Sequence, residues 1–346
     1  RMVNTEKMIN VSRYIKQDMA ELRFDIEFIT PTFLGGAEGN AEIRTPPFKN
    51  LLRRWWRIAN GNLSPEELRK KESRLFGSTE KDPDTGKIFG KSKVMISIDQ
   101  PQSNTVISSE TEKSHLKRFL YLGYGPVQAK SADTRNYIKP GCIVNARIVA
   151  PESEKNMLIR VLTLINLFGT VGSRSRKGFG SIAILPKMDT EDGGFKLYNI
   201  KKLREEIPYL HKGNGMISGD KKQYPYYLSS DEKGMLCWNT AQKSSYQEVL
   251  SDMTDIYRNV VGEAKKTSSS GRTILGSANE VRTTEIKRIP SPLILKVVKQ
   301  GDKYSGRILH LAYNISDEIK QQDKVWHAIY EYLDGQGLKR FGGATK

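Results

Sequence analysis

The sequence predicts an α+β protein of two domains, and three observations support that fold class. A length of 346 residues corresponds to about two domains of roughly 150 residues each. Short segments in which apolar and polar residues alternate indicate strands, and they are interspersed with segments that carry apolar residues at helical spacing. Between residues 21 and 187 these segments follow the order strand, helix, strand, strand, helix, strand.

The first elements have well-marked patterns and ends. Residues 22–29 alternate between apolar and polar side chains, as expected of a half-buried strand, and a loop then reaches Pro47. Pro47 suits a first helical position, and residues 48–60 carry an apolar face at helical spacing. Ser64 is suited to cap a second, short helix that ends at Gly77.

The later elements complete the pattern of the first domain. Strands are expected at residues 94–98, 143–149 and 179–185, and a helix at 153–168. The resulting order is the ferredoxin-like arrangement, which is also the skeleton of RNA-recognition domains. We therefore expect a first ferredoxin-like domain over residues 21–187.

Residues 188–346 are expected to form a second, looser ferredoxin-like domain. Residues 188–245 are rich in turn-forming residues and predict no definite element. Helices are expected at 246–261 and 323–333, and strands at 293–298 and 307–312. Residues 265–284 are rich in Lys, Ser, Thr and Gly and are expected to form a mobile loop.

The charge balance favours an anionic partner. The chain has 56 Lys and Arg against 39 Asp and Glu, a net charge of +17, which points to nucleic acid or a membrane surface. The most apolar stretch, residues 157–168, is too short to cross a bilayer and contains Arg160. No export leader and no zinc-ligand spacing of Cys or His are present. We therefore expect a cytoplasmic protein without a membrane segment, a metal or another cofactor.

A run of cations precedes and enters the helix predicted at 48–60. Its five members, with no acid among them, are Arg44, Lys49, Arg53, Arg54 and Arg57. Three of them recur every four residues and form one stripe that could neutralise phosphates. Trp55 shares the apolar phase and is expected in the core, whereas Trp56 is either a core residue or a stacking surface for a base. The alternative is a solvated basic helix without a ligand.

A glycine-rich segment at residues 169–181 is the second candidate for nucleic-acid contact. Its glycines let the backbone approach a polyanion closely, and three cations accompany them. The candidate residues are Gly172, Ser173, Arg174, Ser175, Arg176, Lys177 and Gly178. The spacing is that of neither a Walker A loop nor a dinucleotide-binding motif, because the predicted helix precedes the glycines. A glycine-rich turn without function is the alternative.

No catalytic residue is predicted from spacing alone. His115 stands alone in the sequence and is expected to be a surface or hydrogen-bonded histidine rather than a base. Residues 82–86, Asp-Pro-Asp-Thr-Gly, have the composition of a turn rather than of an acid pair. Nothing has the spacing of a nucleophile with its base.

Six segments, taken in order along the chain, carry motifs of a known family. They are Phe33–Gly36, Arg44–Arg57, Leu75–Gly77, Gly172–Ser181, Ile274–Gly276 and Lys287–Leu293. These motifs resemble the RAMP superfamily of CRISPR-associated proteins, and within it the family of first subunits of type III-B (Cmr) effector complexes. The resemblance extends over most of the chain, although residues 188–265 contribute no motif.

The resemblance implies two ferredoxin-like RAMP domains, with the glycine-rich loop after the last helix of the first. It also implies an antiviral role as a non-catalytic subunit that binds guide RNA, single-stranded target RNA or both near the 3′ region of the guide. Other Cmr subunits would be its protein partners. One alternative is a RAMP-type endoribonuclease that processes precursor guide RNA, with His115 or Lys177 in acid–base roles. Another is a scaffold whose charge serves partner proteins.

Overall fold

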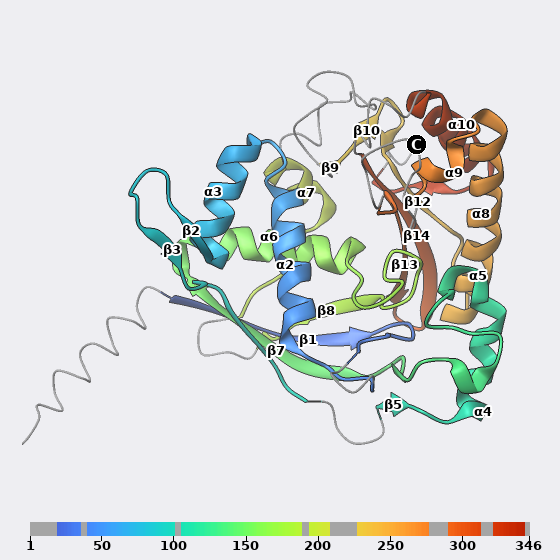
Figure 1. The fold of residues 1–346 in the computed structure, drawn as a ribbon, viewed down its shortest axis with the longest axis horizontal. Coiled ribbons are helices and arrows are strands. Elements are labelled where there is room, and N and C mark those ends of the chain that lie inside the picture. The colour runs from blue at the N-terminus through green and yellow to red at the C-terminus, as the bar shows by residue number, and fades with distance from the viewer. Residues whose placement is uncertain are drawn as a thin grey trace, which may run out of the picture.

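The computed structural model describes residues 19–35, 40–100, 105–188, 194–207, 227–276, 290–312 and 321–342. Within these ranges two main antiparallel sheets lie beside one another, the first at the lower left of Figure 1 and the second toward its right. Helices cover one face of each sheet. They are α2 (Thr45–Ala59) and α6 (Lys155–Phe168) on the first, and α8 (Tyr246–Thr267) and α10 (Gln322–Gly335) on the second.

The first sheet has the strand order of a ferredoxin-like domain. Its strands are β1 (Met19–Phe28), β4 (Met95–Ile98), β7 (Ile143–Pro151) and β8 (Ile182–Pro186). They lie in the order β4-β7-β1-β8, and every neighbouring pair is antiparallel. Along β1, Leu22 and Phe24 are buried while Arg23 on the opposite face is exposed. The alternation in the sequence therefore predicted both this strand and its buried face.

An arm between α2 and β4 projects from the first domain at the upper left of Figure 1. It consists of α3 (Pro65–Phe76) and a hairpin of β2 (Ser78–Lys81) and β3 (Ile88–Gly90). The Ser64 hydroxyl accepts the Glu67 N–H at 3.3 Å and the Glu67 carboxylate accepts the Ser64 N–H at 3.1 Å, so both ends of a capping box are present. The predicted cap at Ser64 and the end of the helix before Gly77 are confirmed.

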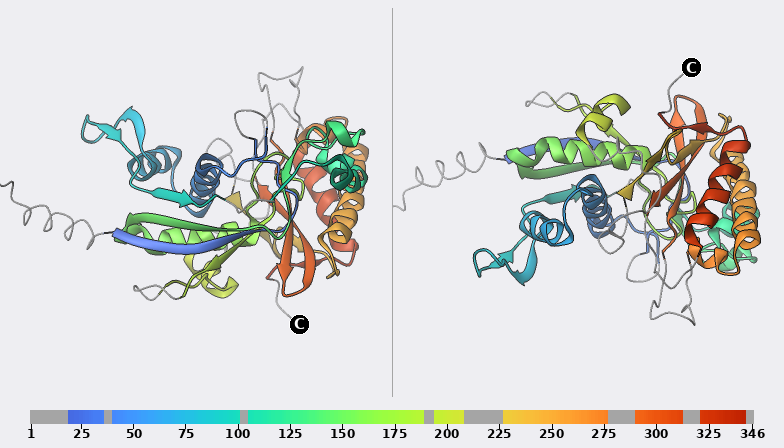
Figure 2. Two further views of the ribbon diagram at one scale, coloured as in Figure 1. Left: turned by 90° about the horizontal axis from the view of Figure 1, so that it is seen from below. Right: turned by 90° about the horizontal axis from the view of Figure 1, so that it is seen from above.

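The second sheet repeats the same plan. Its strands are β12 (Cys237–Asn239), β13 (Leu293–Gln300), β14 (Lys303–Ala312) and β15 (Lys339–Arg340), and β9 (Tyr227–Leu228) also pairs with β14. The order β13-β14-β12-β15 is again second, third, first, fourth in the chain, with antiparallel neighbours. Figure 2 shows α8 and α10 as one layer along this sheet. The prediction of two ferredoxin-like units is confirmed.

The prediction of a mobile loop at residues 265–284 is wrong for its first half, where the structure contains helices. Helix α8 continues to Thr267, beyond the predicted end at 261, because Val260, Val261 and Ala264 extend its buried face. A short helix, α9 (Gly271–Ile274), follows, with Ile274 buried. Residues 277–284 lie outside the described part of the chain.

Each domain sends a segment into the other's core. The long insertion between β4 and β7 places Leu116, Phe119 and Leu122 in the apolar cluster of the second domain. Conversely, Leu203 and Ile207 pack into the cluster of the first domain. The division at residue 187 between two domains remains our proposal, since apolar packing is continuous across it. The β4–β7 insertion contains β5 (Val106–Ile107), α4 (Glu110–Lys113), η1 (Ser114–Phe119), α5 (Leu120–Gly123), η2 (Ser131–Asp133) and β6 (Tyr137–Ile138), and Leu203 lies in α7 (Ile200–Glu206). The remaining elements are η3 (Glu152–Glu154), before α6, and β10 (Ser230–Asp231) and β11 (Gly234–Met235), before β12.

Two buried cations of the second sheet bind the end of a helix of the first domain. The Lys296 ammonium donates to the carbonyls of Ile165 and Asn166 at 2.9 and 2.8 Å. The Arg307 guanidinium donates to the Leu167 carbonyl at 2.9 Å. These are among the last carbonyls of α6, which carry the negative end of the helix dipole, and of the three only that of Ile165 also accepts a backbone N–H at the helix end, from Gly169 at 2.7 Å. The two cations therefore fix the C-terminus of α6 to the second sheet.

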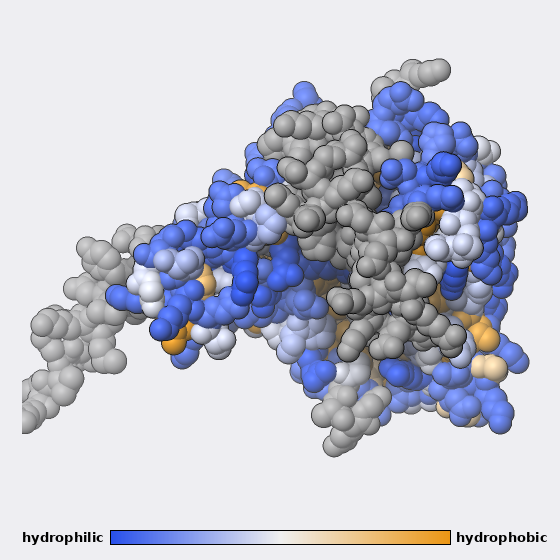
Figure 3. All heavy atoms as spheres, turned by 45° about the horizontal axis from the view of Figure 1, so that its top comes forward, coloured by the Kyte–Doolittle hydropathy of each residue, from blue (hydrophilic) through white to orange (hydrophobic). Residues whose placement is uncertain are grey.

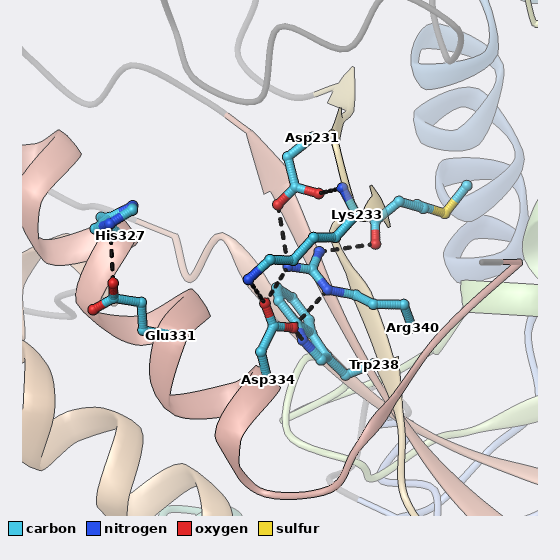
Figure 4. Close-up of polar contacts among 8 residues, drawn as sticks. Asp231, Lys233, Trp238, His327, Glu331, Asp334 and Arg340 are labelled. Carbon is cyan, nitrogen blue, oxygen red and sulfur yellow. Dashed lines mark hydrogen bonds and ion pairs between the residues drawn. The ribbon is translucent and has the colours of Figure 1, made fainter. Parts of the chain in front are cut away.

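A polar cluster ties the last strand to the second domain (Figure 4). The Arg340 guanidinium donates to both carboxylate oxygens of Asp334, at 2.7 and 3.0 Å, and lies 4.2 Å from the centre of the Trp238 ring. Asp334 also accepts the indole N–H of Trp238 at 2.7 Å. Burial alone raises the pKa of Asp334, but the hydrogen bonds from Arg340 and Trp238 outweigh it and lower the pKa to about 2.

The visible surface in Figure 3 is mainly hydrophilic, with small separate hydrophobic spots. Among the described residues, none of the helices is long and apolar enough to cross a membrane. No group of three or more His, Cys, Asp or Glu side chains in this part of the chain is arranged to hold a metal ion.

Candidate nucleic-acid interface

The glycine-rich loop is held against the first domain by its backbone. The N–H of Val171 donates to the Gly180 carbonyl at 2.8 Å, and that of Ser173 to the Phe33 carbonyl at 2.9 Å. Gly180 has φ +64°, and a Cβ atom there would lie 1.8 Å from the Val171 carbonyl oxygen. Only glycine fits this position. The glycine at this position therefore serves the closed shape of the loop itself.

The loop also joins the edge of the second sheet. The Gly178 N–H donates to the Leu295 carbonyl at 3.0 Å, and the Leu295 N–H donates to the Arg176 carbonyl at 3.1 Å. The Ser181 hydroxyl accepts the N–H of Val297 at 2.9 Å. Since Leu295 and Val297 belong to β13, the loop connects both domains, and the side chains between Arg174 and Lys177 are presented where the domains meet.

A cavity of about 1240 Å³ opens at this junction. Its walls come from the glycine-rich loop, the β4–β7 insertion, α8 and α9. Eight cationic residues line it, and no Asp or Glu is among the described lining residues. The cations are Lys117, Arg118, Arg135, Arg174, Arg176, Lys177, Arg258 and Arg272. Cations that surround a concave, partly desolvated space focus a positive potential within it, which favours an anionic ligand.

Lys177 lies deepest among the loop cations. Its ammonium is 3.1 Å from the Ser291 hydroxyl and 3.6 Å from the centre of the Tyr257 ring. Burial lowers the pKa of Lys177 well below its usual value, and Arg272 and Arg174 lower it further. Because no carboxylate lies among the described lining residues, nothing there offsets this effect. A phosphate that entered the cavity would supply a negative charge and so stabilise the charged form of Lys177.

Arg174 is exposed at the edge of the cavity. Its backbone has φ +58°, a conformation that non-glycine residues adopt rarely and at a cost. Its guanidinium donates to the Tyr124 carbonyl, which holds the side chain toward the β4–β7 insertion. Partial burial lowers the pKa of Arg174, although the Tyr257 hydroxyl nearby acts in the opposite direction. The strained backbone thus directs a charged group to the rim of the cavity.

The predicted basic stripe on α2 has a different environment. The Nε atoms of Arg53 and Arg57 donate to the two carboxylate oxygens of Glu72 on α3, at 2.9 and 2.7 Å. Trp56 is only 3% exposed and packs edge-on against Phe76, 6.0 Å between ring centres. The interpretation of Trp56 as a stacking surface is therefore wrong for this structure, because its ring belongs to the core.

The structure does not bring α2 into the cavity. Arg44 donates to the Gly35 carbonyl at 2.7 Å and lies 3.8 Å from Glu42, while Lys49 and Arg54 are half-buried on α2. None of the five cations of this segment lines the cavity. The glycine-rich loop and the basic helix were predicted as two parts of an RNA path, and in the fold only the loop meets the carboxylate-free cavity.

The weak catalytic candidates are also separated. Lys177 lines the cavity, whereas His115 does not. Burial lowers the pKa of His115. Residues 82–86 form the turn predicted for them, between β2 and β3, with the Asp82 carboxylate bound by Arg74 at 2.8–3.0 Å.

Sequence reasoning missed most of the cavity wall. Five of the eight cations and all three tyrosines lie outside the two predicted segments. One signal was available, because residues 117–135 interleave cations with tyrosines, a pattern typical of surfaces that bind single-stranded RNA. Arg258 and Arg272 carried no such signal, since only the fold brings α8 and α9 to the loop.

Comparisons with known proteins agree with this architecture. Residues 25–183 match the model of the RAMP superfamily. Over 311 residues the chain is 26% identical to the CRISPR system Cmr subunit Cmr1-1 of Pyrococcus furiosus, an alignment that covers 83% of this chain and 86% of that protein.

Two solved structures share the fold. The crystal structure of apo Cmr1 from Pyrococcus furiosus matches with a TM-score of 0.60 and 21% identity, over 92% of this chain and 98% of that one. A chain of the type III-B Cmr-beta complex bound to cognate target RNA matches with a TM-score of 0.56 and 13% identity, over 92% and 99%. The ferredoxin-like first domain of this chain is thus similar to proteins of the RAMP superfamily over residues 25–183.

Proposed function

We propose that this chain is a non-catalytic RNA-binding subunit of a type III-B CRISPR (Cmr) RNA-guided interference complex. In that complex it contacts guide RNA, single-stranded target RNA or both near the 3′ region of the guide. The observation that carries the proposal is the cavity at the domain junction, lined by eight cations without a carboxylate among the described lining residues. Other Cmr subunits are its protein partners in this proposal.

The similarity to Cmr1-1 of Pyrococcus furiosus and to a chain of an RNA-bound Cmr-beta complex supports this assignment. The physical argument is independent of that similarity. Each phosphate bound by Lys or Arg releases condensed counterions, so affinity should fall steeply as salt rises and should depend little on sequence. The excess of 17 positive charges is consistent with a polyanionic ligand.

The test is binding of the purified chain to a labelled single-stranded RNA across a salt series. Replacing Arg174, Arg176 and Lys177 together by Ala should weaken binding by about 1–3 kcal/mol, roughly 5- to 150-fold, and reduce the salt slope by about 2. The matched control replaces three exposed lysines outside the cavity, Lys265, Lys303 and Lys324. Equal affinities of the loop variant and the control at every salt concentration would refute the assignment of the loop.

The position of Lys177 against the Tyr257 ring and the Ser291 hydroxyl favours a second candidate, an endoribonuclease that processes precursor guide RNA. Burial lowers the pKa of this amine, which makes it a better proton acceptor for a ribose 2′-hydroxyl than an exposed lysine. The same gel distinguishes the two functions when repeat RNA is incubated without added metal. Intact RNA supports the binding subunit, whereas discrete products that disappear in Lys177→Met would establish the nuclease.

A further inference from the structure

One aromatic side chain at the mouth of the cavity is unusually exposed. Tyr124 lines the cavity and is 65% accessible, more than any other large hydrophobic residue reported as exposed in the described ranges. Leaving an aromatic ring in water gives up the stabilisation that its burial would provide. An exposed ring next to a concentration of cations therefore suggests a ligand that has both an apolar face and negative charge.

The other two tyrosines of the cavity are already engaged. The Tyr257 ring lies beneath the Lys177 ammonium, and its hydroxyl has Arg272 and Ser291 as hydrogen-bond partners. Tyr121 has the Arg258 guanidinium 5.0 Å from its ring centre. By contrast, no aromatic ring or cation of the described residues stacks on Tyr124. Tyr124 is thus the ring in this cavity that offers a face to a ligand.

The backbone holds Tyr124 in position. It pairs with Val127 in a β-bridge, and the Gln128 side-chain amide donates to the Gly125 carbonyl at 2.6 Å. Its own carbonyl accepts the Arg174 guanidinium. A ring on a fixed turn loses little conformational entropy when a planar group stacks on it. The same contact places the Arg174 guanidinium beside the Tyr124 turn.

We propose that Tyr124 stacks on an unpaired nucleobase whose adjacent phosphate is bound by Arg174 and Arg272. This inference rests on the proposed RNA-binding function and defines what the cavity recognises: a nucleotide whose base is turned away from its neighbours. Arg174 adjoins the Tyr124 turn and Arg272 lines the same cavity, so one nucleotide can contact the ring and the cations together. The bases of a duplex are stacked inside the helix, so the site selects single-stranded RNA.

The experiment compares two labelled oligomers of equal length and charge, an oligouridine RNA and the same ribose-phosphate chain without bases. The full chain should bind the oligouridine about fivefold or more tightly, the contribution expected of one stacked base. Tyr124→Ala should abolish this preference, and Tyr124→Phe should retain it because the ring remains. The salt slope should be the same for all three proteins, since no charge is removed. Thermal unfolding of each variant checks that the fold is intact.

Three outcomes would overturn the inference. Equal affinity of the unmodified chain for the two oligomers would show that no base is recognised. An equal loss for both oligomers in Tyr124→Ala would show that the side chain acts through the shape of the loop. A preference that survives in Tyr124→Ala would place the stacking elsewhere. In each case salt-sensitive RNA binding persists, whereas a chain that binds neither oligomer at low salt would contradict the proposed function itself.

Discussion

The segments 44–57 and 169–181 look alike in the sequence and differ in the fold. Both combine several cations with no acid in the cationic run, and both were predicted to contact RNA. In the structure, Arg53 and Arg57 share the carboxylate of Glu72, which is only 6% exposed, whereas the loop cations enter a cavity without a described carboxylate in its lining. A local count of charges therefore identifies a binding surface only when distant acids are known.

The largest expected effect comes from comparing a glycine of the loop, Gly180, with a glycine that precedes α2, Gly35. Gly180→Ala should destabilise the protein by about 2–4 kcal/mol and weaken RNA binding, because the new Cβ would overlap the Val171 carbonyl and distort the loop. Gly35→Ala, before α2, should change stability by less than about 0.5 kcal/mol, since no atom of the described residues lies within 4 Å of the added Cβ. Denaturant unfolding and RNA titration measure both effects. Similar stabilities of the two variants would contradict the close packing of the loop.

The second prediction concerns the ion pair between Arg340 and Asp334, in which an acid neutralises a cation outside the cavity. Asp334→Asn should cost about 1–2 kcal/mol at pH 7, a figure reduced for partial solvent exposure, because Arg340 keeps a weaker acceptor. The pKa of Asp334 is about 2 in the folded protein and 3.8 is its ordinary value. Its contribution is therefore fully present above pH 4 and is lost as the pH falls through 2.

Unfolding curves between pH 2 and 7 measure this dependence. The stability difference between the unmodified chain and Asp334→Asn should shrink toward zero at the acid end of the range. A difference that stays constant with pH would show that the carboxylate charge does not contribute. RNA affinity at pH 7 should be unchanged, since none of the residues of the cluster lines the cavity.

The smallest expected effect concerns the acid that neutralises α2. Glu72→Gln should lower stability by about 1 kcal/mol, because the amide oxygen can accept from only one of Arg53 and Arg57 and the carboxylate charge is lost. It should also raise RNA affinity at low salt by about twofold through the additional net charge. An increase above about fivefold would show that α2 itself contacts RNA and would remove the distinction between the two segments.

Much of the fold could be predicted because its information is local. The alternation in β1, the capping box at Ser64 and the apolar spacing of α6 each lie within a few residues of the element that they specify. The short strands β12 and β15 could not be predicted, since two or three residues carry no period. Strand β12 pairs with β14 and with β15, which are both remote from it in the sequence.

The candidate site was predictable only in part for the same reason. The glycine-rich loop is continuous, and its cations and glycines were visible together. The environments of Trp56 and Arg57 were not, because Phe76 and Glu72 reach them only through the turn between α2 and α3. The cavity is assembled from five segments between residues 117 and 291, so its composition exists only in three dimensions.

The contacts of Lys296 and Arg307 with the end of α6 can form only after most of the chain has been synthesised. These cations follow the carbonyls that they bind by 131 and 140 residues. A ribosome synthesises α6 and the glycine-rich loop long before it adds β13 and β14, and domains fold from the N-terminus as they emerge. The first domain therefore emerges with its helix end uncovered, and the cationic cavity is completed only late in translation, when α8, α9 and Ser291 have been added.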